Sequence, residues 1–194
     1  MKVGNILITL TFLCLAGFTS CKKDDLPPVE NKGKVITNVT LIFNPTEGGA
    51  PLTFTASDPD GEGSEEIETG TINLPANSSF QLFIKLDNSI TDEDVTLEVQ
   101  DEGTEHLFFF GFTEDVFSQP PGVGNLEDRE GHVNYIDEDE NGLPIGLITG
   151  WQTGEPKSGT FTIVLKDQKD LKSERSTSHD GITDINLTWN LVIE

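Results

Sequence analysis

Cysteine is scarce in this sequence, and both cysteines lie near its start. Cys14 and Cys21 are the two thiols among 194 residues, so residues 22–194 contain none. That part of the chain therefore has no side chain for a disulfide, a cysteine nucleophile or a thiolate-ligated zinc ion. Its stability must come from packing and hydrogen bonding.

Basic residues are also few. The chain has 12 Lys and Arg against 34 Asp and Glu, which gives a formal net charge of −22 at pH 7. Nucleic acid and anionic lipid headgroups would bring like charges together, so we exclude both as partners. Cations, neutral sugars and basic protein surfaces remain. The alternative is that the acidic side chains serve solubility on a solvated surface.

Long apolar runs are missing except at residues 6–18. This run is too short to span a bilayer, which takes about 20 apolar residues. Lys2 precedes it, and the small residues Thr19 and Ser20 follow it, which is the pattern of a cleaved signal peptide. We therefore predict that residues 1–20 are a signal peptide.

The next residue resembles the modified position of the lipobox in bacterial lipoproteins, where a cysteine after small residues is acylated and becomes the N-terminus. Cys21 occupies that position, although Phe18 stands where the usual pattern has Leu. Two acyl chains anchor a protein stably, whereas one does so marginally. We predict that Cys21 is lipidated and anchors the protein to the membrane. The alternative is ordinary signal-peptidase cleavage that leaves Cys21 as an unmodified thiol without a role.

Residues 23–25, Lys-Asp-Asp, resemble the surface-export tag of Bacteroidota-type lipoproteins. The resemblance implies an outer-membrane lipoprotein that faces the cell surface, with the periplasmic face as the alternative. Residues 21–34 contain Pro27-Pro28 and many charges without apolar periodicity, so we expect a polar tether there.

From Val35 onward the pattern is that of short β-strands. Apolar and polar residues alternate, and Gly, Pro, Asn and Asp clusters separate the runs at intervals of roughly 8–12 residues. The expected strands are residues 35–43, 52–56, 67–74, 79–86, 105–112, 131–136, 144–151, 159–166 and 182–193. We predict one all-β domain over residues 35–194, an antiparallel β-sandwich that is immunoglobulin-like in general form.

Three segments carry further expectations. Residues 105–112 have apolar side chains at both parities, so this strand should be buried on both faces near the middle of the core. Residues 182–193 place five apolar side chains on one face and should run through a sheet centre. Residues 113–129 should form a long loop, which is uncommon unless it binds a ligand or is disordered. The expected core includes Phe109, Phe110, Trp151, Phe161 and Trp189.

Residues 90–103 fit two conformations. Thr91 with Asp94 resembles a capping box, whereas the alternating apolar residues that follow fit a strand. We expect a short helical turn at residues 91–94 that runs into extended chain.

Two acidic loops have the spacing of the first half of a calcium-binding loop, with alternating oxygen ligands and a glycine for the turn. The candidate ligands are Asp137, Asp139 and Asn141 in one loop and Asp58, Asp60 and Glu62 in the other. The twelfth position of the first loop is Ile148 instead of a bidentate Glu, so it is not an EF-hand. Turn formation alone is the alternative, because hairpin turns use the same residue types. Ca²⁺ is the one cofactor that the sequence suggests.

Histidines and their acidic neighbours are further candidate metal ligands. They are Glu105, His106, His132, His179 and Asp180. The histidines lack the spacing of a metal motif, so isolated histidines are the favoured interpretation. The chain also lacks a G-x-S-x-G motif and a Gly-rich phosphate loop, so we predict no catalytic residues and no enzymatic activity.

The domain as a whole resembles an uncharacterised family of Bacteroidota lipoproteins. The matching motifs are Glu105-His106 before Phe108-Phe109-Phe110, then Asp137-x-Asp139-x-Asn141-Gly142-x-Pro144-x-Gly146-Leu147, then Thr183-Asp184-Ile185. Members are often labelled as having a type 1 periplasmic-binding fold, which is a two-lobed α/β architecture. The sequence shows no alternating βα units, so we expect the all-β fold.

These observations predict a non-catalytic binding lipoprotein of the cell envelope, which captures a nutrient or metal for an outer-membrane transporter. The alternative is a structural or adhesive surface lipoprotein that binds a protein or glycan, with calcium at most structural. A pocket lined by aromatic and polar loop side chains would favour the first, and a flat acidic face would favour the second.

Overall fold

The protein folds as a β-sandwich. The computed structural model describes residues 34–58 and 67–194, which belong to one compact unit, residues 31–194. A seven-stranded sheet has the order β2-β1-β4-β9-β7, with β5 beside β4 and β8 beside β9, and a four-stranded sheet has the order β3-β11-β10-β6. Among the described strands every pair is antiparallel except β3 with β11. The all-β prediction is confirmed.

The elements have the following bounds. The larger sheet contains β1 (Asn38–Pro45), β2 (Leu52–Ser57), β4 (Ser79–Asn88), β5 (Glu93–Asp94), β7 (Phe117–Gln119), β8 (Asn134–Tyr135) and β9 (Ile148–Thr153). The smaller sheet contains β3 (Thr71–Leu74), β6 (His106–Phe112), β10 (Lys157–Asp167) and β11 (Ile182–Ile193). A short helix, α1 (Val95–Asp101), lies between β5 and β6.

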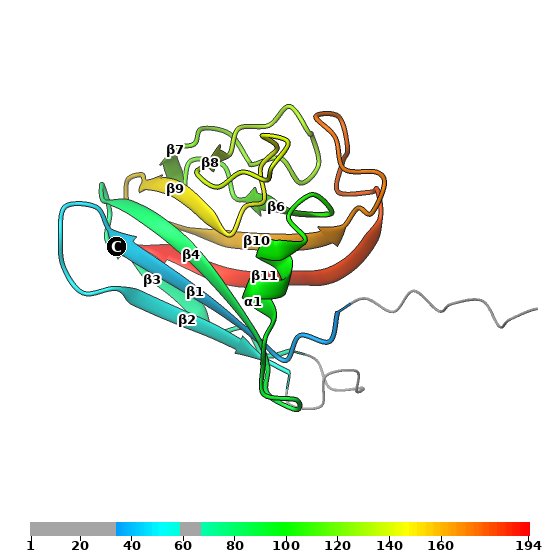
Figure 1. Cartoon of the computed structure of the whole chain (residues 1–194). Helices are drawn as coiled ribbons and strands as arrows, with labels where there is room; N and C mark the ends of the chain where they lie inside the picture. Colours follow the sequence, from blue (N-terminus) through cyan, green and yellow to red (C-terminus); the bar gives the residue numbers. More distant parts are fainter. Residues whose placement is uncertain (1–33, 59–66) are drawn as a thin grey trace, which may run out of the picture. The chain divides into compact units, whose positions relative to one another are not determined.

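The two sheets pack face to face and enclose the core (Figure 1). Because side chains alternate along a strand, every second residue of β1, β4 and β11 is buried between the sheets. The ring of Phe161 on β10 lies 6.3 Å from that of Phe43 on β1 and 5.2 Å from that of Trp151 on β9. Such edge-to-face pairs contribute about 0.5–1.5 kcal/mol each beyond the burial of area. The five aromatic side chains expected in the core are all buried.

The places of β11 and β6 in the smaller sheet can be compared with the predictions for residues 182–193 and 105–112. β11 lies between β3 and β10, which confirms its predicted central place. β6 is buried on both faces, as predicted, and it is the last strand of its sheet. Apolar residues at both parities indicate burial, and they carry no information on the order of strands.

The segment after β6 folds back along the free edge of that strand. The N–H of Phe112 donates to the carbonyl of Val123 (3.0 Å), and the N–H of Asn125 donates to the carbonyl of Phe110 (2.9 Å). The side chain of Asn125 also accepts from the N–H of Phe110 (3.0 Å). On the outer face, Phe109 belongs to a small cluster separate from the main core. Part of the predicted long loop therefore acts as a partner for the edge strand.

The helix α1 corrects the expectation of a turn before Asp94 followed by extended chain. Asp94 caps the helix, because its carboxylate accepts the N–H of Thr96 (3.0 Å). Val95 and Val99 are buried, while Leu97 between them is 59% exposed, which is a helical and not a strand pattern. Within residues 34–58 and 67–194, no helix is long and apolar enough to cross a membrane.

Several strands are shorter than expected. β3, β8 and β9 cover only parts of the predicted runs, and β7 lies within the predicted long loop. β9 begins at Ile148 because the chain bends sharply before it. Gly146 has φ +92°, and a Cβ there would lie 2.8 Å from the Cβ of Phe108, so this bend needs glycine.

Candidate ligand-binding pocket

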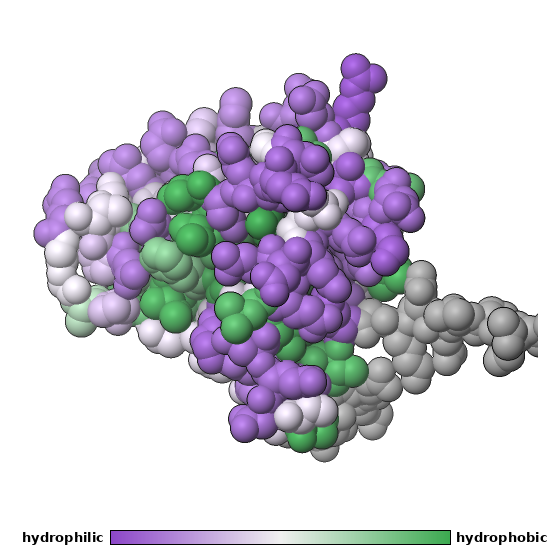
Figure 2. Space-filling view, in the orientation of Figure 1, coloured by the Kyte–Doolittle hydropathy of each residue, from purple (hydrophilic) through white to green (hydrophobic). Residues whose placement is uncertain are grey.

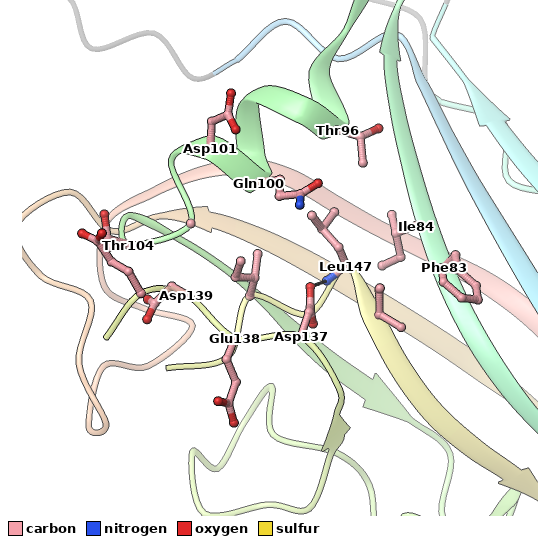
Figure 3. Close-up of a pocket in the computed structure, with 14 residues that line it drawn as sticks. Phe83, Ile84, Thr96, Gln100, Asp101, Thr104, Asp137, Glu138, Asp139 and Leu147 are labelled. Atoms are coloured by element: carbon pink, nitrogen blue, oxygen red, sulfur yellow. Dashed lines mark hydrogen bonds between the residues drawn. The ribbon is translucent and has the colours of Figure 1, made fainter. Parts of the chain in front are cut away.

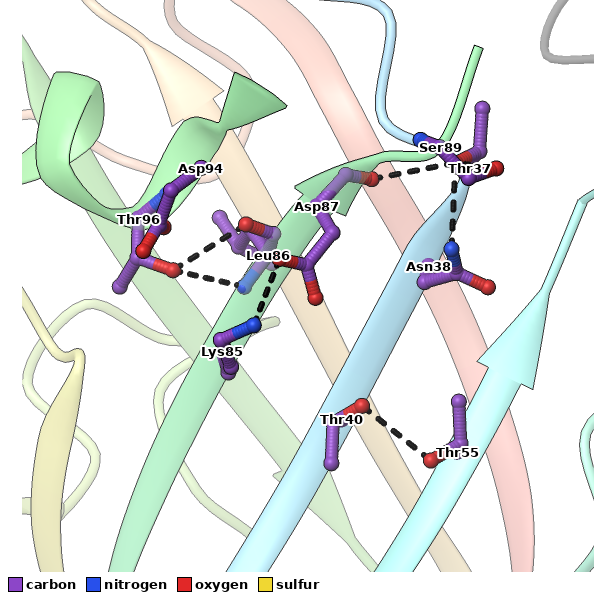
Figure 4. A network of polar contacts seen from close by, with 10 residues as sticks. All are labelled: Thr37, Asn38, Thr40, Thr55, Lys85, Leu86, Asp87, Ser89, Asp94 and Thr96. Atoms are coloured by element: carbon purple, nitrogen blue, oxygen red, sulfur yellow. Dashed lines mark hydrogen bonds and ion pairs between the residues drawn. The ribbon is translucent and has the colours of Figure 1, made fainter. Parts of the chain in front are cut away.

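A pocket opens where β9 separates from β4. The two strands pair as far as Phe83, and the N–H of Ile84 still donates to the carbonyl of Leu147 (2.9 Å). Beyond this point α1 lies beside β4 and hydrogen-bonds to it, where β9 no longer does. The hydroxyl of Thr96 accepts from the N–H of Leu86 (2.9 Å) and donates to its carbonyl (3.1 Å) (Figure 4). A cavity of about 500 Å³ remains between β4, α1 and the start of β9.

The floor of the pocket is apolar. Its apolar lining consists of Phe83, Ile84, Ile145, Leu147 and Ile148. Phe83 has the parity of β4 that faces away from the core and is half-buried. Figure 3 shows Gln100, which also lines the pocket, extending from α1 toward Leu147. The volume lies within the range of about 300–1,000 Å³ that small-molecule sites occupy.

The rim of the pocket is acidic. Its acidic lining consists of Asp101, Asp137, Glu138, Asp139 and Glu140, and no lining residue described in the structure is basic. Asp101 comes from the end of α1, and the others come from the loop that precedes β9. In Figure 3 the carboxylates of Asp101 and Glu138 extend outward from the cavity. The pocket therefore combines an apolar interior with a negatively charged mouth.

Asp137 holds the conformation of the loop before β9. Its Oδ1 accepts the N–H of Gly146 (3.0 Å), and its Oδ2 accepts the N–H of Leu147 (2.9 Å). Burial raises the pKa of Asp137, and the backbone N–H groups oppose this rise. Because both oxygens already accept backbone hydrogen bonds, Asp137 fixes the shape of the pocket wall.

Asp139 forms a buried ion pair. Its Oδ1 accepts the N–H groups of Asn141 (2.8 Å) and Leu143 (2.9 Å), and its Oδ2 lies 2.9 Å from Nζ of Lys172. Burial by itself raises the pKa of Asp139, but the ammonium and the two N–H groups outweigh it, so the pKa lies below its usual value. Burial lowers the pKa of Lys172, and the carboxylate of Asp139 opposes that shift. The ammonium also donates to the carbonyl of Gly103 (2.7 Å).

The contacts of Asp137 and Asp139 add no support for calcium binding. The carboxylates of Asp137 and Asp139 accept backbone N–H groups, which is the turn-forming alternative named above. Asp58 directly follows β2, whereas Asp60 and Glu62 lie outside the described residues. Calcium binding stays a prediction, which a comparison of Ca²⁺ and Mg²⁺ effects on Tm would check.

His106 lies at the start of β6 in a buried polar contact. Its Nδ1 donates to the carbonyl of Glu102 (3.1 Å), and its Nε2 lies 3.7 Å from Oδ2 of Asp184. Both side chains are almost fully buried, and burial raises the pKa of Asp184. The N–H of Lys34 donates to the other oxygen of Asp184 (3.0 Å). This contact ties the first described residue to β6 and β11.

The remaining candidate metal ligands do not come together. Glu105 forms a largely exposed ion pair with Lys169 (3.6 Å). His132 and His179 are exposed, and Asp180 accepts hydrogen bonds within its own turn. Across the described ranges, no three His, Cys, Asp or Glu side chains are placed to hold a metal ion. The assignment of these residues as ligands stays a prediction.

Several pocket residues escaped the sequence analysis. Phe83 carried one signal, because a large aromatic side chain occupies the outward parity of an otherwise regular strand. No pattern in the sequence indicated Gln100 or Thr96. Their roles depend on α1, which begins at Val95, whereas the sequence predicts a helical turn at residues 91–94. Lys172 is one charged residue in a polar loop, and its partner lies far away in the sequence.

We compared the chain with protein-family models, with curated proteins and with solved structures, and none of them matches. The resemblance to Bacteroidota lipoproteins therefore stays a prediction.

Proposed function

We propose that this protein is a non-catalytic binding lipoprotein of the cell envelope, and that it holds its ligand in the pocket between β4, α1 and β9. The observation that carries this proposal is the pocket itself. It has an aromatic and aliphatic floor and a polar rim supplied by a loop, which is the arrangement that distinguishes a ligand-capturing protein from one with a flat acidic face.

The pocket is supported by a rigid frame. β4 forms one wall and pairs with both β1 and β9, and two hydrogen bonds from Thr96 fix α1 to this strand. Lys172 joins the acidic loop to the end of α1 through Asp139 and Gly103. A wall that is already ordered reduces the entropy lost when a ligand binds.

The location in the envelope rests on the sequence of the first 25 residues, which lie outside the described part of the chain. Lipidation of Cys21 would hold the pocket close to the membrane, where a captured ligand is available to an outer-membrane transporter. The proposal therefore joins two independent features, an anchor and a pocket.

An adhesive function is the second candidate, and an apolar row on the sheet surface favours it. Ile42, Phe83 and Ile148 lie side by side on β1, β4 and β9, and all three are half-buried. Ile136 extends the row, since its N–H donates to the carbonyl of Ile148 (3.0 Å), and it is 49% exposed. Figure 2 shows hydrophobic areas on this face of the molecule, bordered by hydrophilic residues. A protein or glycan could dock on such a surface.

A neutral fluorescent probe tests the pocket. N-phenyl-1-naphthylamine, which brightens in apolar surroundings, should bind the wild-type protein. Gln100→Trp should suppress the signal, because Gln100 lines the cavity and points toward Leu147, so that a bulky indole there would occupy the space of the probe (Figure 3). Leu97→Trp is the matched control, since Leu97 is exposed on the same helix and does not line the pocket. Equal signals from Gln100→Trp and Leu97→Trp would contradict the proposal, as would no signal from the wild type.

A further inference from the structure

We propose that the pocket selects organic cations in which an ammonium or guanidinium group is carried on an apolar stem. This inference rests on the proposed function and names the chemical class of its ligand. Free alkylamines and the lysine or arginine side chains of a polypeptide share this chemistry.

The charges around the pocket support a cationic ligand. Five acidic side chains line it, and among the described lining residues none is basic. Asp137 and Asp139 are engaged by backbone N–H groups and by Lys172. Lys172 neutralises the charge of Asp139, and both oxygens of Asp137 already have backbone partners.

The three other acids are free to meet a ligand. Asp101, Glu138 and Glu140 are exposed, and within the described structure no hydrogen bond or ion pair engages their carboxylates. They come from two segments, the end of α1 and the loop before β9, on either side of the same cavity. A cation at the mouth would therefore lie in the electrostatic field of carboxylates from both segments.

The apolar floor specifies the rest of the ligand. Phe83, Leu147 and Ile148 offer no charged atoms, so a fully hydrated inorganic ion gains nothing from them. An alkyl stem buries its methylenes against such a floor while its charged head stays at the wet rim, as lysine side chains do on protein surfaces. An apolar floor beneath an acidic mouth thus matches a cation with an apolar stem and a charged head.

The same arrangement rejects anions and favours cations over neutral molecules. The whole chain carries a formal net charge of −22, which opposes the approach of any carboxylate or phosphate. The charge of Lys172 offsets only that of Asp139, and its ammonium offers an anionic ligand no contact, because the side chain is 1% exposed and is held by Asp139 and Gly103. A neutral molecule of the same shape gains the apolar contacts alone.

Three probes of equal length test the inference. Hexylamine, 1-hexanol and hexanoate differ in charge and have unbranched chains of the same overall length, and each would compete with N-phenyl-1-naphthylamine for the full-length protein at low ionic strength. We expect hexylammonium to bind about tenfold more tightly than 1-hexanol, and hexanoate to bind most weakly. A second arm uses the tripeptide Gly-Lys-Gly with both ends blocked. Competition by hexylamine alone assigns free amines, and competition by the tripeptide assigns a lysine side chain of a partner.

A charge-neutralised pocket provides the control. Asp101→Asn/Glu138→Gln/Glu140→Gln should lower the affinity for hexylammonium toward that for 1-hexanol and leave binding of the neutral probe unchanged. The matched variant Asp92→Asn/Glu127→Gln/Glu174→Gln removes three exposed acids that do not line the pocket, and it should behave as the wild type does.

The outcomes separate the two proposals. If hexylammonium and 1-hexanol bind equally, or the two triple variants bind hexylammonium alike while the neutral probe still binds, the cation inference is wrong and the proposed pocket remains. If the neutral probe fails to bind the wild type, both are wrong.

Discussion

The Nζ atom of Lys172 lies 2.9 Å from Oδ2 of Asp139, and both side chains are 1% exposed. The same ammonium donates to the carbonyl of Gly103 (2.7 Å). A loop after β10 is thereby joined to two segments that line the pocket, the chain after α1 and the loop before β9. The shape of the pocket depends on this buried ion pair.

Removal of the ammonium should destabilise the protein strongly. We expect Lys172→Met to lower the free energy of unfolding by about 3–5 kcal/mol, because it leaves the buried carboxylate of Asp139 without its partner. Urea denaturation measures the loss. Lys169→Met is the control, since its ion pair with Glu105 is largely exposed and should contribute less than about 1 kcal/mol. Equal losses in the two variants would show that burial of the Lys172 pair adds nothing.

The same pair predicts a dependence on pH. The pKa of Asp139 is lowered in the folded protein, so its ionised form contributes stability above the usual pKa of 3.8, and this contribution is lost as the pH falls through the folded-state pKa. Wild type and Asp139→Asn should therefore differ most near neutral pH and converge in acid. Urea titrations over a series of pH values measure this difference. A difference that stays constant down to the acid range would refute the assignment.

The attachment of α1 to β4 gives a further prediction. Thr96→Val should cost about 1–3 kcal/mol, because it leaves the N–H and the carbonyl of Leu86 without their partner. Thr55→Val makes the same chemical change on β2, where the hydroxyl contacts that of Thr40 (3.2 Å) at an exposed position (Figure 4). We expect this control to stay within about 0.5 kcal/mol of the wild type. Equal effects in urea denaturation would argue against the role of Thr96.

Lipidation can be tested in cells. A radiolabelled fatty acid should be incorporated into the wild-type protein when it is made in a bacterium, and Cys21→Ala should abolish the labelling. The reason is that residues 22–194 contain no other thiol to acylate. Labelling that persists in Cys21→Ala would remove the anchor from the proposed function.

The sequence by itself determined most of the sandwich. The alternation of residues 182–193 placed β11 correctly, because a strand with one buried face must alternate. The dense aromatic run of residues 105–112 indicated burial on both faces of β6, and this too is observed. The net charge of −22 predicts that anionic partners are disfavoured. These properties follow from local periodicity and composition.

The tertiary structure decided where the site lies. Val95, Leu97 and Val99 satisfy a strand pattern as well as a helical one, and the open edge of β4 at Leu86 selected the helix. Apolar parity did not reveal that β6 ends its sheet, because strand order depends on partners elsewhere in the chain. The pairing of Lys172 with Asp139 joins residues that no short motif connects. The pocket exists because β9 leaves β4 at Phe83, and that separation results from the packing of all three segments together.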